Sequence, residues 1–230
     1  MNTILKFKQT ENSRVYLSSD FHLNHSPKWP IPIWKARGYN SVVEMNDAII
    51  DSINSAIRYT DILFFLGDFV LNCSESQFEE ILSRINCQRI YMLFGNHNSC
   101  VWSAYQREIH SWLRYNNEGY NSDGGGSVGI DGGDPEIYPL KYRNIIFIGN
   151  YAEIHIDGSI FILNHYPLFS WNHMSKGSIH CHGHIHSTKE TYIQRGRTID
   201  VGFDYWKRPV AADEIRRMMV NVDIKHEGHH

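Results

Sequence analysis

The feature that most restricts the fold is a strand pattern that recurs with the same ending. The apolar runs 62–66 and 90–94 each have the length and character of a strand buried on both faces, and a shorter run at 15–17 precedes them. Each run leads into polar side chains, and a glycine stands between strand and polar group in the two later cases. The polar residues at these three strand ends are Asp20, His22, Asp68, Asn96 and His97.

Amphipathic helices are predicted between these strands. The ranges 41–57 and 74–85 carry apolar residues at helical spacing, and each begins with a serine followed three residues later by Glu or Gln, the pattern of a capping box. Strands that alternate with helices predict an α/β fold with a largely parallel sheet, whose ligands bind at the carboxyl ends of the strands. We therefore expect the polar strand ends to converge. The alternative, a turn with a stray polar residue, explains one instance well and three poorly.

The rest of the chain is predicted to be richer in strands and loops. Range 25–39 contains prolines and is expected to be a loop, 101–115 a helix, and about 116–143 a Gly/Asn/Asp-rich insertion or loop within a single domain spanning 1–230. Asp157-Gly158 is a hairpin dipeptide. Further strands are expected at 144–148, 152–156, 159–163, 191–193 and 198–201, with a closing helix at 211–219.

A dense histidine tract lies within 179–186, which reads Ile-His-Cys-His-Gly-His-Ile-His. Neutral imidazole is a common ligand of transition-metal ions, and alternate residues of an extended segment share a face, so His184 and His186 can point together. The alternative is a solvated histidine tract. Because the run is internal and follows an apolar segment, a metal site is the better interpretation.

Composition limits the class of protein. The chain has 230 residues, of which 42% are apolar, so it can bury a sizeable core and is not a disordered protein. Its 22 basic and 25 acidic residues give no overall positive field, so nucleic acid could bind only through a local groove. The four cysteines form no CxxC pair, and no signal sequence or membrane-length apolar run is evident. We expect a cytoplasmic protein without a membrane partner.

The ordered polar blocks resemble those of the calcineurin-like metallophosphoesterases. That family carries D-x-H, G-D, G-N-H, a lone H and G-H-x-H, and the same blocks occur here in the same order. They stand at Asp20-Phe21-His22, Gly67-Asp68, Gly95-Asn96-His97, His165 and Gly183-His184-Ile185-His186. The resemblance implies a four-layer αββα sandwich.

The resemblance also implies two metal ions. One would be held by Asp20, His22, Asp68 and His186, and the other by Asp68, Asn96, His165 and His184, with Asp68 bridging the two. Such a pair of cations, about 3.5–4 Å apart, can clamp the attacking and leaving oxygens of a phosphoryl displacement and supply a bridging hydroxide as nucleophile. The mixed nitrogen and oxygen ligands suit Mn, Fe, Ni, Zn or Co without choosing among them, and Mn is the metal to add in assays.

The same resemblance gives His97 a catalytic role at the phosphate, where it would protonate the leaving oxygen or stabilise phosphoryl charge. Many relatives have an acidic residue after G-N-H where this chain has Asn98, so a different group would have to orient His97. The segment after Asp68 lacks the arginine typical of the protein-phosphatase branch. The D-x-H-x-x-H start and the segments 201–206 and 208–210 look like the small bacterial and phage-type phosphoesterases. His25 and Arg37 are candidates for the phosphate-side rim.

The sequence thus predicts a metal-dependent phosphoric ester hydrolase, with phosphodiester hydrolysis of a nucleotide or another small phosphate ester as the first hypothesis. Alternatives are a phosphomonoesterase or nuclease of the same fold, and a metal-stabilised binding module without turnover. A binding module would be expected to have lost ligands, whereas every ligand position here is filled. His182 is given at most a supporting contact behind the ligands.

Overall fold

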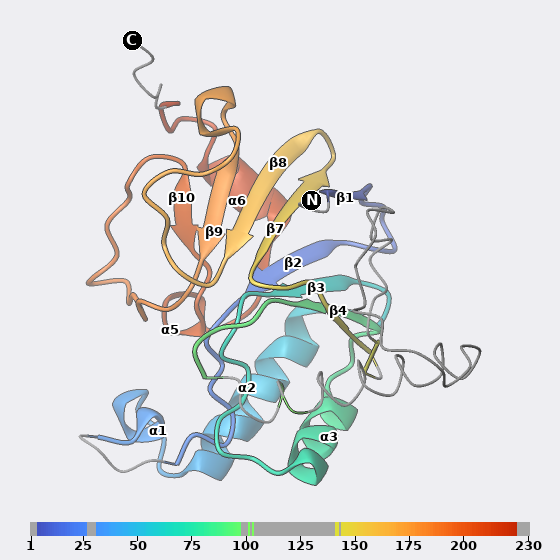
Figure 1. Ribbon diagram of the computed structural model, residues 1–230. Coiled ribbons are helices and arrows are strands. Elements are labelled where there is room, and N and C mark those ends of the chain that lie inside the picture. The colour runs from blue at the N-terminus through green and yellow to red at the C-terminus, as the bar shows by residue number, and fades with distance from the viewer. Residues whose placement is uncertain are drawn as a thin grey trace, which may run out of the picture.

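The computed structural model describes residues 4–26, 31–97, 101, 103, 141–142 and 144–224, which form two β-sheets with helices packed around them (Figure 1). The six-stranded sheet has the order β11 (Val210–Ala211), β2 (Val15–Ser18), β3 (Ile62–Phe65), β4 (Arg89–Met92), β6 (Ile145–Phe147) and β5 (Lys141–Tyr142). The five-stranded sheet has the order β1 (Ile4–Phe7), β7 (Tyr151–Ile156), β8 (Ser159–Asn164), β9 (Ile179–His182) and β10 (Thr198–Asp200). The helices are α1 (Ile33–Ala36), α2 (Val42–Ala56), α3 (Glu75–Arg84), the 3₁₀ helix η1 (Met174–Lys176), α5 (Phe203–Trp206) and α6 (Ala212–Met218).

The predicted parallel arrangement is confirmed in the six-stranded sheet. Strands β2, β3, β4 and β6 are parallel neighbours, and their last residues lie in register, with Ser18 beside Phe65 and Phe65 beside Met92. The chain therefore leaves three neighbouring strands at the same edge. This register brings the polar residues that follow β2, β3 and β4 to one place.

The two faces of each central strand have different neighbours. In β3, Phe64 belongs to the core between the two sheets, together with Leu17 and Leu163. Its neighbour Phe65 faces the other way, into a second core that α2 and α3 complete with residues such as Ile49 and Phe78. The alternation explains why the run is apolar throughout, because both faces are covered. The expected sandwich of two sheets with helices is confirmed.

The outer face of the five-stranded sheet is covered in part by the segment 165–178, which includes η1. The Trp171 ring lies 5.2 Å from the His180 ring of β9, measured between centroids. The Leu168 amide donates to His180 Nε2 at 3.0 Å, and Asn172 donates to Glu153 of β7 at 2.7 Å. These contacts fix the segment that follows His165.

Among the described residues, no helix combines the length and the apolar character that crossing a bilayer requires.

Some local predictions were wrong. The loop expected at 25–39 contains α1, because Pro32 stands at the N-cap with φ −57°, a position at which proline does not interrupt the helix. No strand forms at 191–193, since the Tyr192 amide donates to the Thr188 carbonyl and closes a turn. Ser41 caps α2, but the Glu44 carboxylate accepts from Asn40 and not from the Ser41 amide that a capping box requires.

Predictions for two other segments lie largely outside the described residues. The helix expected at 101–115 is represented by Val101 and Ser103, both helical. The insertion at about 116–143 is represented by 141–142, which form β5 antiparallel to β6 and not a loop. The hairpin at Asp157-Gly158 and the capping box that starts α3 are confirmed.

Candidate metal centre

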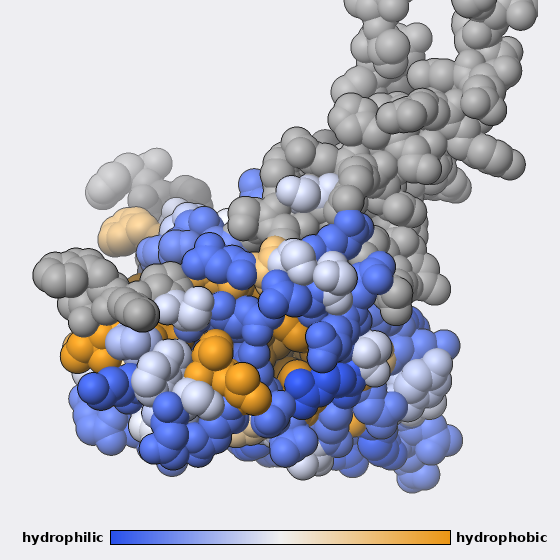
Figure 2. All heavy atoms as spheres, turned by 90° about the horizontal axis from the view of Figure 1, so that it is seen from below, coloured by the Kyte–Doolittle hydropathy of each residue, from blue (hydrophilic) through white to orange (hydrophobic). Residues whose placement is uncertain are grey.

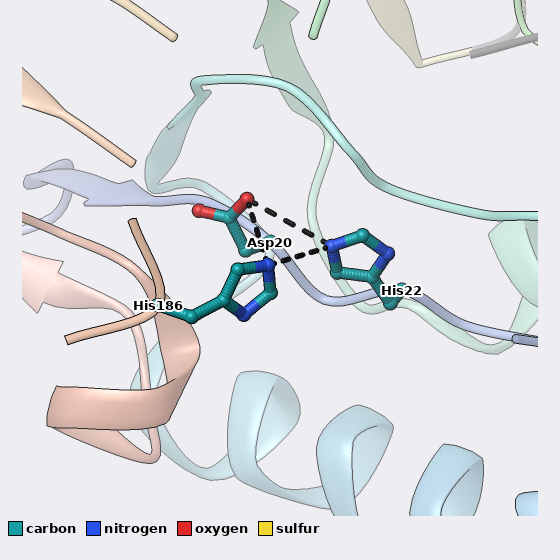
Figure 3. Close-up of side chains that lie close together, drawn as sticks. All are labelled: Asp20, His22 and His186. Atoms are coloured by element: carbon teal, nitrogen blue, oxygen red, sulfur yellow. Dashed lines mark hydrogen bonds and ion pairs between the residues drawn. The ribbon is translucent and has the colours of Figure 1, made fainter. Parts of the chain in front are cut away.

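The first group of predicted ligands consists of Asp20, His22 and His186, which turn toward a common point (Figure 3). The Nε2 atoms of His22 and His186 are 3.2 Å apart, and each lies 3.9 Å from Asp20 Oδ1. Asp20 Oδ1 is buried and has no hydrogen-bond partner within the described part of the chain. A buried carboxylate oxygen without a donor is costly, and a divalent cation between it and the two imidazoles would satisfy all three.

The second group joins the first through its carboxylates. Asp20, Asp68 and His165 lie close enough for one ion to contact all three. Asp68 Oδ2 is 3.6 Å from His165 Nε2 and also 3.6 Å from His22 Nε2, so one oxygen faces a histidine of each group. Asn96 Oδ1 lies 2.8 Å from His165 Nε2 and 3.0 Å from His184 Nδ1. All seven predicted ligands therefore converge.

Five of these ligands have left-handed backbone conformations. The φ angles are 59° at Asp20, 51° at His22, 60° at Asp68, 71° at His184 and 48° at His186. Such angles are uncommon outside glycine and concentrate at functional sites, where the surrounding fold holds them. The extended geometry expected at His184 and His186 is thus wrong. His186 joins Asp20 and His22, whereas His184 turns to Asn96, so the two histidines serve different groups.

Two glycines allow the ligand segments to approach closely. A Cβ on Gly95 would lie 2.2 Å from Asp68 Oδ1, and a Cβ on Gly183 would lie 2.2 Å from Asp20 Oδ2. Real Cβ atoms do not tolerate such distances, so any side chain at either position would displace a ligand carboxylate. The glycines of the G-N-H and G-H-x-H blocks are explained by this steric requirement.

The electrostatics favour neutral histidine ligands. Burial lowers the pKa of His22 to about 2, and burial is also the main cause that lowers the pKa of His165. His165 Nδ1 donates to the Leu66 carbonyl at 2.8 Å, which leaves the lone pair on Nε2 directed at Asp68 and Asn96. Burial raises the pKa of Asp20 to about 6, because the charged carboxylate loses contact with water. A bound cation would stabilise the charged form and lower this pKa again.

Asp204 is a site residue that the sequence interpretation missed. Its Oδ2 accepts from His186 Nδ1 at 2.6 Å, and its two oxygens accept from Arg37 Nε at 2.7 Å and Nη2 at 3.0 Å. Despite burial, these bonds hold the pKa of Asp204 well below its usual range. Burial alone would lower the pKa of His186. The hydrogen bond to Asp204 and the charge of Asp20 outweigh burial, so the pKa of His186 is raised. The only signal in the sequence was the position of Asp204 within the segment 201–206, to which no role was attached.

The predicted rim residues have different surroundings. The Arg37 side chain is 2% exposed, and besides Asp204 it donates to the carbonyls of Asp20 and Phe21, both at 2.7 Å. Arg37 thus supports the ligand segment from behind. His25 lies beside the first group, with its ring 5.2 Å from the His22 ring. Its buried Nδ1 has no hydrogen-bond partner in the described ranges.

His97 and His182 differ in exposure. The His97 amide donates to Asp68 Oδ1 at 2.8 Å, its exposed side chain lies on the surface, and its ring is 5.7 Å from the His22 ring. His182 is buried on β9, and its Nδ1 contacts the Gly183 carbonyl at 3.0 Å. Asn98, which distinguishes this chain from many relatives, lies outside the described residues.

Comparison with known proteins connects this geometry to a family. Over 86 residues the chain is 34% identical to the uncharacterized protein MJ1445 of Methanocaldococcus jannaschii. The match covers 37% of this chain and 47% of that protein, so the chain spans about half the length of this curated relative. A solved structure, the protein of unknown function AQ665 from Aquifex aeolicus, aligns with a TM-score of 0.56 at 18% identity, covering 90% of this chain and 100% of that one, which shows a shared fold.

The sequence profile of the calcineurin-like phosphoesterases matches residues 13–208, a range that contains every predicted ligand as well as Asp204. Members of this family are generally phosphoester hydrolases that depend on divalent metal ions. The match covers most of the chain, and the side chains it contains form two adjoining groups able to hold metal. The chain belongs to the calcineurin-like phosphoesterase family.

Proposed function

We propose that this protein is a binuclear metal-dependent phosphoesterase that acts as a phosphodiesterase on a nucleotide or another small phosphate ester. The observation that carries the proposal is the position of Asp68 Oδ2, 3.6 Å from a histidine of each ligand group. A carboxylate shared in this way suits two cations held close together. The family match supports the hydrolysis of phosphoesters.

The contacts around Asp68 support two ligand sets. Asp20, His22, Asp68 and His186 would hold one ion, and Asp68, Asn96, His165 and His184 would hold the other. When bound, two divalent cations would polarise the phosphate oxygens and lower the pKa of coordinated water. Asp204 would keep the Nδ1 proton of His186 in place, so that Nε2 remains available as a ligand.

His97 is proposed to contact the substrate. Its backbone amide is fixed to Asp68 Oδ1, which places the residue beside the shared carboxylate, while its side chain stays exposed on the surface. An imidazole in that place can donate a proton to the leaving oxygen or stabilise charge on the phosphoryl oxygens. Positioned proton transfer of this kind contributes about 10²–10⁴ in rate.

The test is hydrolysis of bis-p-nitrophenyl phosphate, p-nitrophenyl phosphate and a nucleotide panel with added Mn²⁺, together with the metal content per chain. We expect diester hydrolysis with two ions per chain. Asp68→Asn should lose metal and activity together, whereas His97→Ala should keep the metal and lose about 10²–10⁴ in kcat. His155→Ala, which alters a histidine bound to Glu153 on β7, is the matched control and should change neither.

Protein that binds two ions but cleaves none of these esters would be a binding module without turnover, and the proposal would be wrong. Full activity in His97→Ala would refute the role of His97. Binding to DNA or RNA that weakens steeply with salt would favour the nuclease alternative.

A further inference from the structure

A cavity of about 560 Å³ lies beside the metal centre and has no part in the ligand geometry described above. Its walls come mainly from two segments, Pro167 to Met174 after β8 and Ile185 to Thr198 before and at the start of β10, and His182 of β9 also lines it. The volume is in the range of pockets that bind small organic molecules. The cavity is therefore large enough for the organic part of a phosphate ester.

Both wall segments begin at the ligands of the second ion site. Ile185 lines the cavity and stands between His184 and His186 in the chain. Pro167 lines it two residues after His165. Tyr166 stands between His165 and Pro167 in the chain, and its ring contacts the His184 ring, with centroids 4.6 Å apart. Consecutive Cα atoms are only about 3.8 Å apart, so an ester with its phosphate at the ions could reach the cavity with its organic group.

Aromatic side chains from both segments line the cavity. Trp171 is fixed by a hydrogen bond from its indole nitrogen to Ser178 Oγ at 3.0 Å, and Tyr192 is fixed by its hydroxyl, which donates to Gln194 at 2.6 Å. Phe169 and Ile193 also line it, although their side chains are 101% and 67% exposed. Rigid aromatic walls with apolar residues left open to solvent favour a planar aromatic guest.

Two polar groups at the cavity have hydrogen-bonding capacity that the protein does not use. Thr198 Oγ1 is buried and has no hydrogen-bond partner among the residues that the structure describes. The Arg195 guanidinium, also at the cavity, forms no hydrogen bond or ion pair to any residue in the described part of the chain. A buried hydroxyl and a free guanidinium complement a ring that carries carbonyl or ring-nitrogen acceptors.

We propose that this cavity binds the nucleobase of a nucleotide ester whose phosphate lies at the metal centre. The inference rests on the proposed function, because it names the organic group that the same site would accept. Trp171 and Tyr192 would flank the base, Arg195 and Thr198 would contact its polar edge, and Phe169 would cover it at the rim. A simple alkyl ester would leave these groups without contacts.

The test compares two esters with the same leaving group, thymidine 5′-p-nitrophenyl phosphate and methyl p-nitrophenyl phosphate, using the Mn²⁺-loaded full chain. We expect a higher kcat/KM for the thymidine ester. Phe169→Ala and Arg195→Gln should each reduce kcat/KM for that ester by about 5- to 100-fold, mainly through KM, and leave the methyl ester unchanged. Val43→Ala, which shortens a 62% exposed side chain on α2, is the control and should change neither.

Equal kcat/KM for the two esters, or unchanged preference in both cavity variants, would overturn the inference while leaving the proposed function intact. If neither ester is cleaved, equilibrium dialysis of labelled thymidine 5′-monophosphate against chelator-treated protein measures nucleotide binding to the cavity without turnover. Binding that weakens in Phe169→Ala and Arg195→Gln would then support the cavity and reject the hydrolase. An absence of binding would reject the cavity as a base site.

Discussion

Replacing Asp204 with asparagine tests whether the contact behind His186 supports the metal centre. The substitution preserves the shape of the side chain but removes its negative charge and one of the two oxygens that accept from Arg37 and His186. Arg37 would keep its bonds to the carbonyls of Asp20 and Phe21, and its cationic group would remain 98% buried without a counter-ion. We expect losses in both stability and metal affinity.

The magnitude follows from burial. Breaking a fully buried ion pair costs about 3–5 kcal/mol, and because Asp204 is 11% exposed and asparagine retains one acceptor, we expect about 2–4 kcal/mol in the free energy of unfolding. Losing the partner of a ligand histidine typically weakens metal binding about 10–100-fold, which corresponds to about 1.4–2.7 kcal/mol. The two effects are measured separately.

Urea unfolding of chelator-treated protein, followed by circular dichroism, gives the first quantity, and calorimetric titration with Mn²⁺ gives the second. Asp47→Asn is the matched control. Asp47 pairs with Arg84 at 2.6 Å, but the two side chains are 49% and 40% exposed. An exposed pair contributes less than about 1 kcal/mol, and this one lies away from the ligands. The reasoning is refuted if both variants lose equal stability, or if Asp204→Asn binds Mn²⁺ as tightly as the wild type.

Three further outcomes are expected. Gly95→Ala should abolish high-affinity Mn²⁺ binding in titration calorimetry, because its Cβ would meet the Asp68 carboxylate. Gly149→Ala is the control and should bind Mn²⁺ normally, since no atom of the described residues lies within 4 Å of its Cβ. Intact Mn²⁺ binding in Gly95→Ala would contradict the steric argument. Burial lowers the pKa of His180 from its ordinary value of 6.5 to about 4 in the folded protein. Between pH 6.5 and pH 4 the unfolded chain binds a proton at His180 that the folded protein does not bind. The free energy of unfolding should therefore fall by about 3 kcal/mol as the pH drops from 6.5 to 4. In urea titrations of His180→Asn, the free energy of unfolding should lack this part of its pH dependence. If it changes with pH in the variant as it does in the wild type, His180 is not the cause. Added Mn²⁺ should raise the melting temperature of the wild type but not of Asp68→Asn, as differential scanning calorimetry can check.

The sequence was sufficient to predict the type of fold and which polar side chains come together. The apolar runs that become β3 and β4 are buried on both faces, so their pattern is unambiguous, and parallel strands in register bring their carboxyl ends to one edge. The polar residues after each strand therefore had to lie near each other. Local signals such as the Ser74 cap also determined where α3 begins.

Only the tertiary structure decided how those residues are divided and supported. Left-handed backbone at His184 and His186 sends neighbouring histidines to different groups, which a pattern of alternating faces does not predict. Arg37 and Asp204 are 167 positions apart in sequence, and their contact depends on how α1 and α5 pack near the end of β2. The cavity likewise forms mainly from two loops that no periodicity describes. Residue type and strand register are local properties that a sequence carries, whereas strained dihedrals and contacts between distant segments arise only when the whole chain has packed.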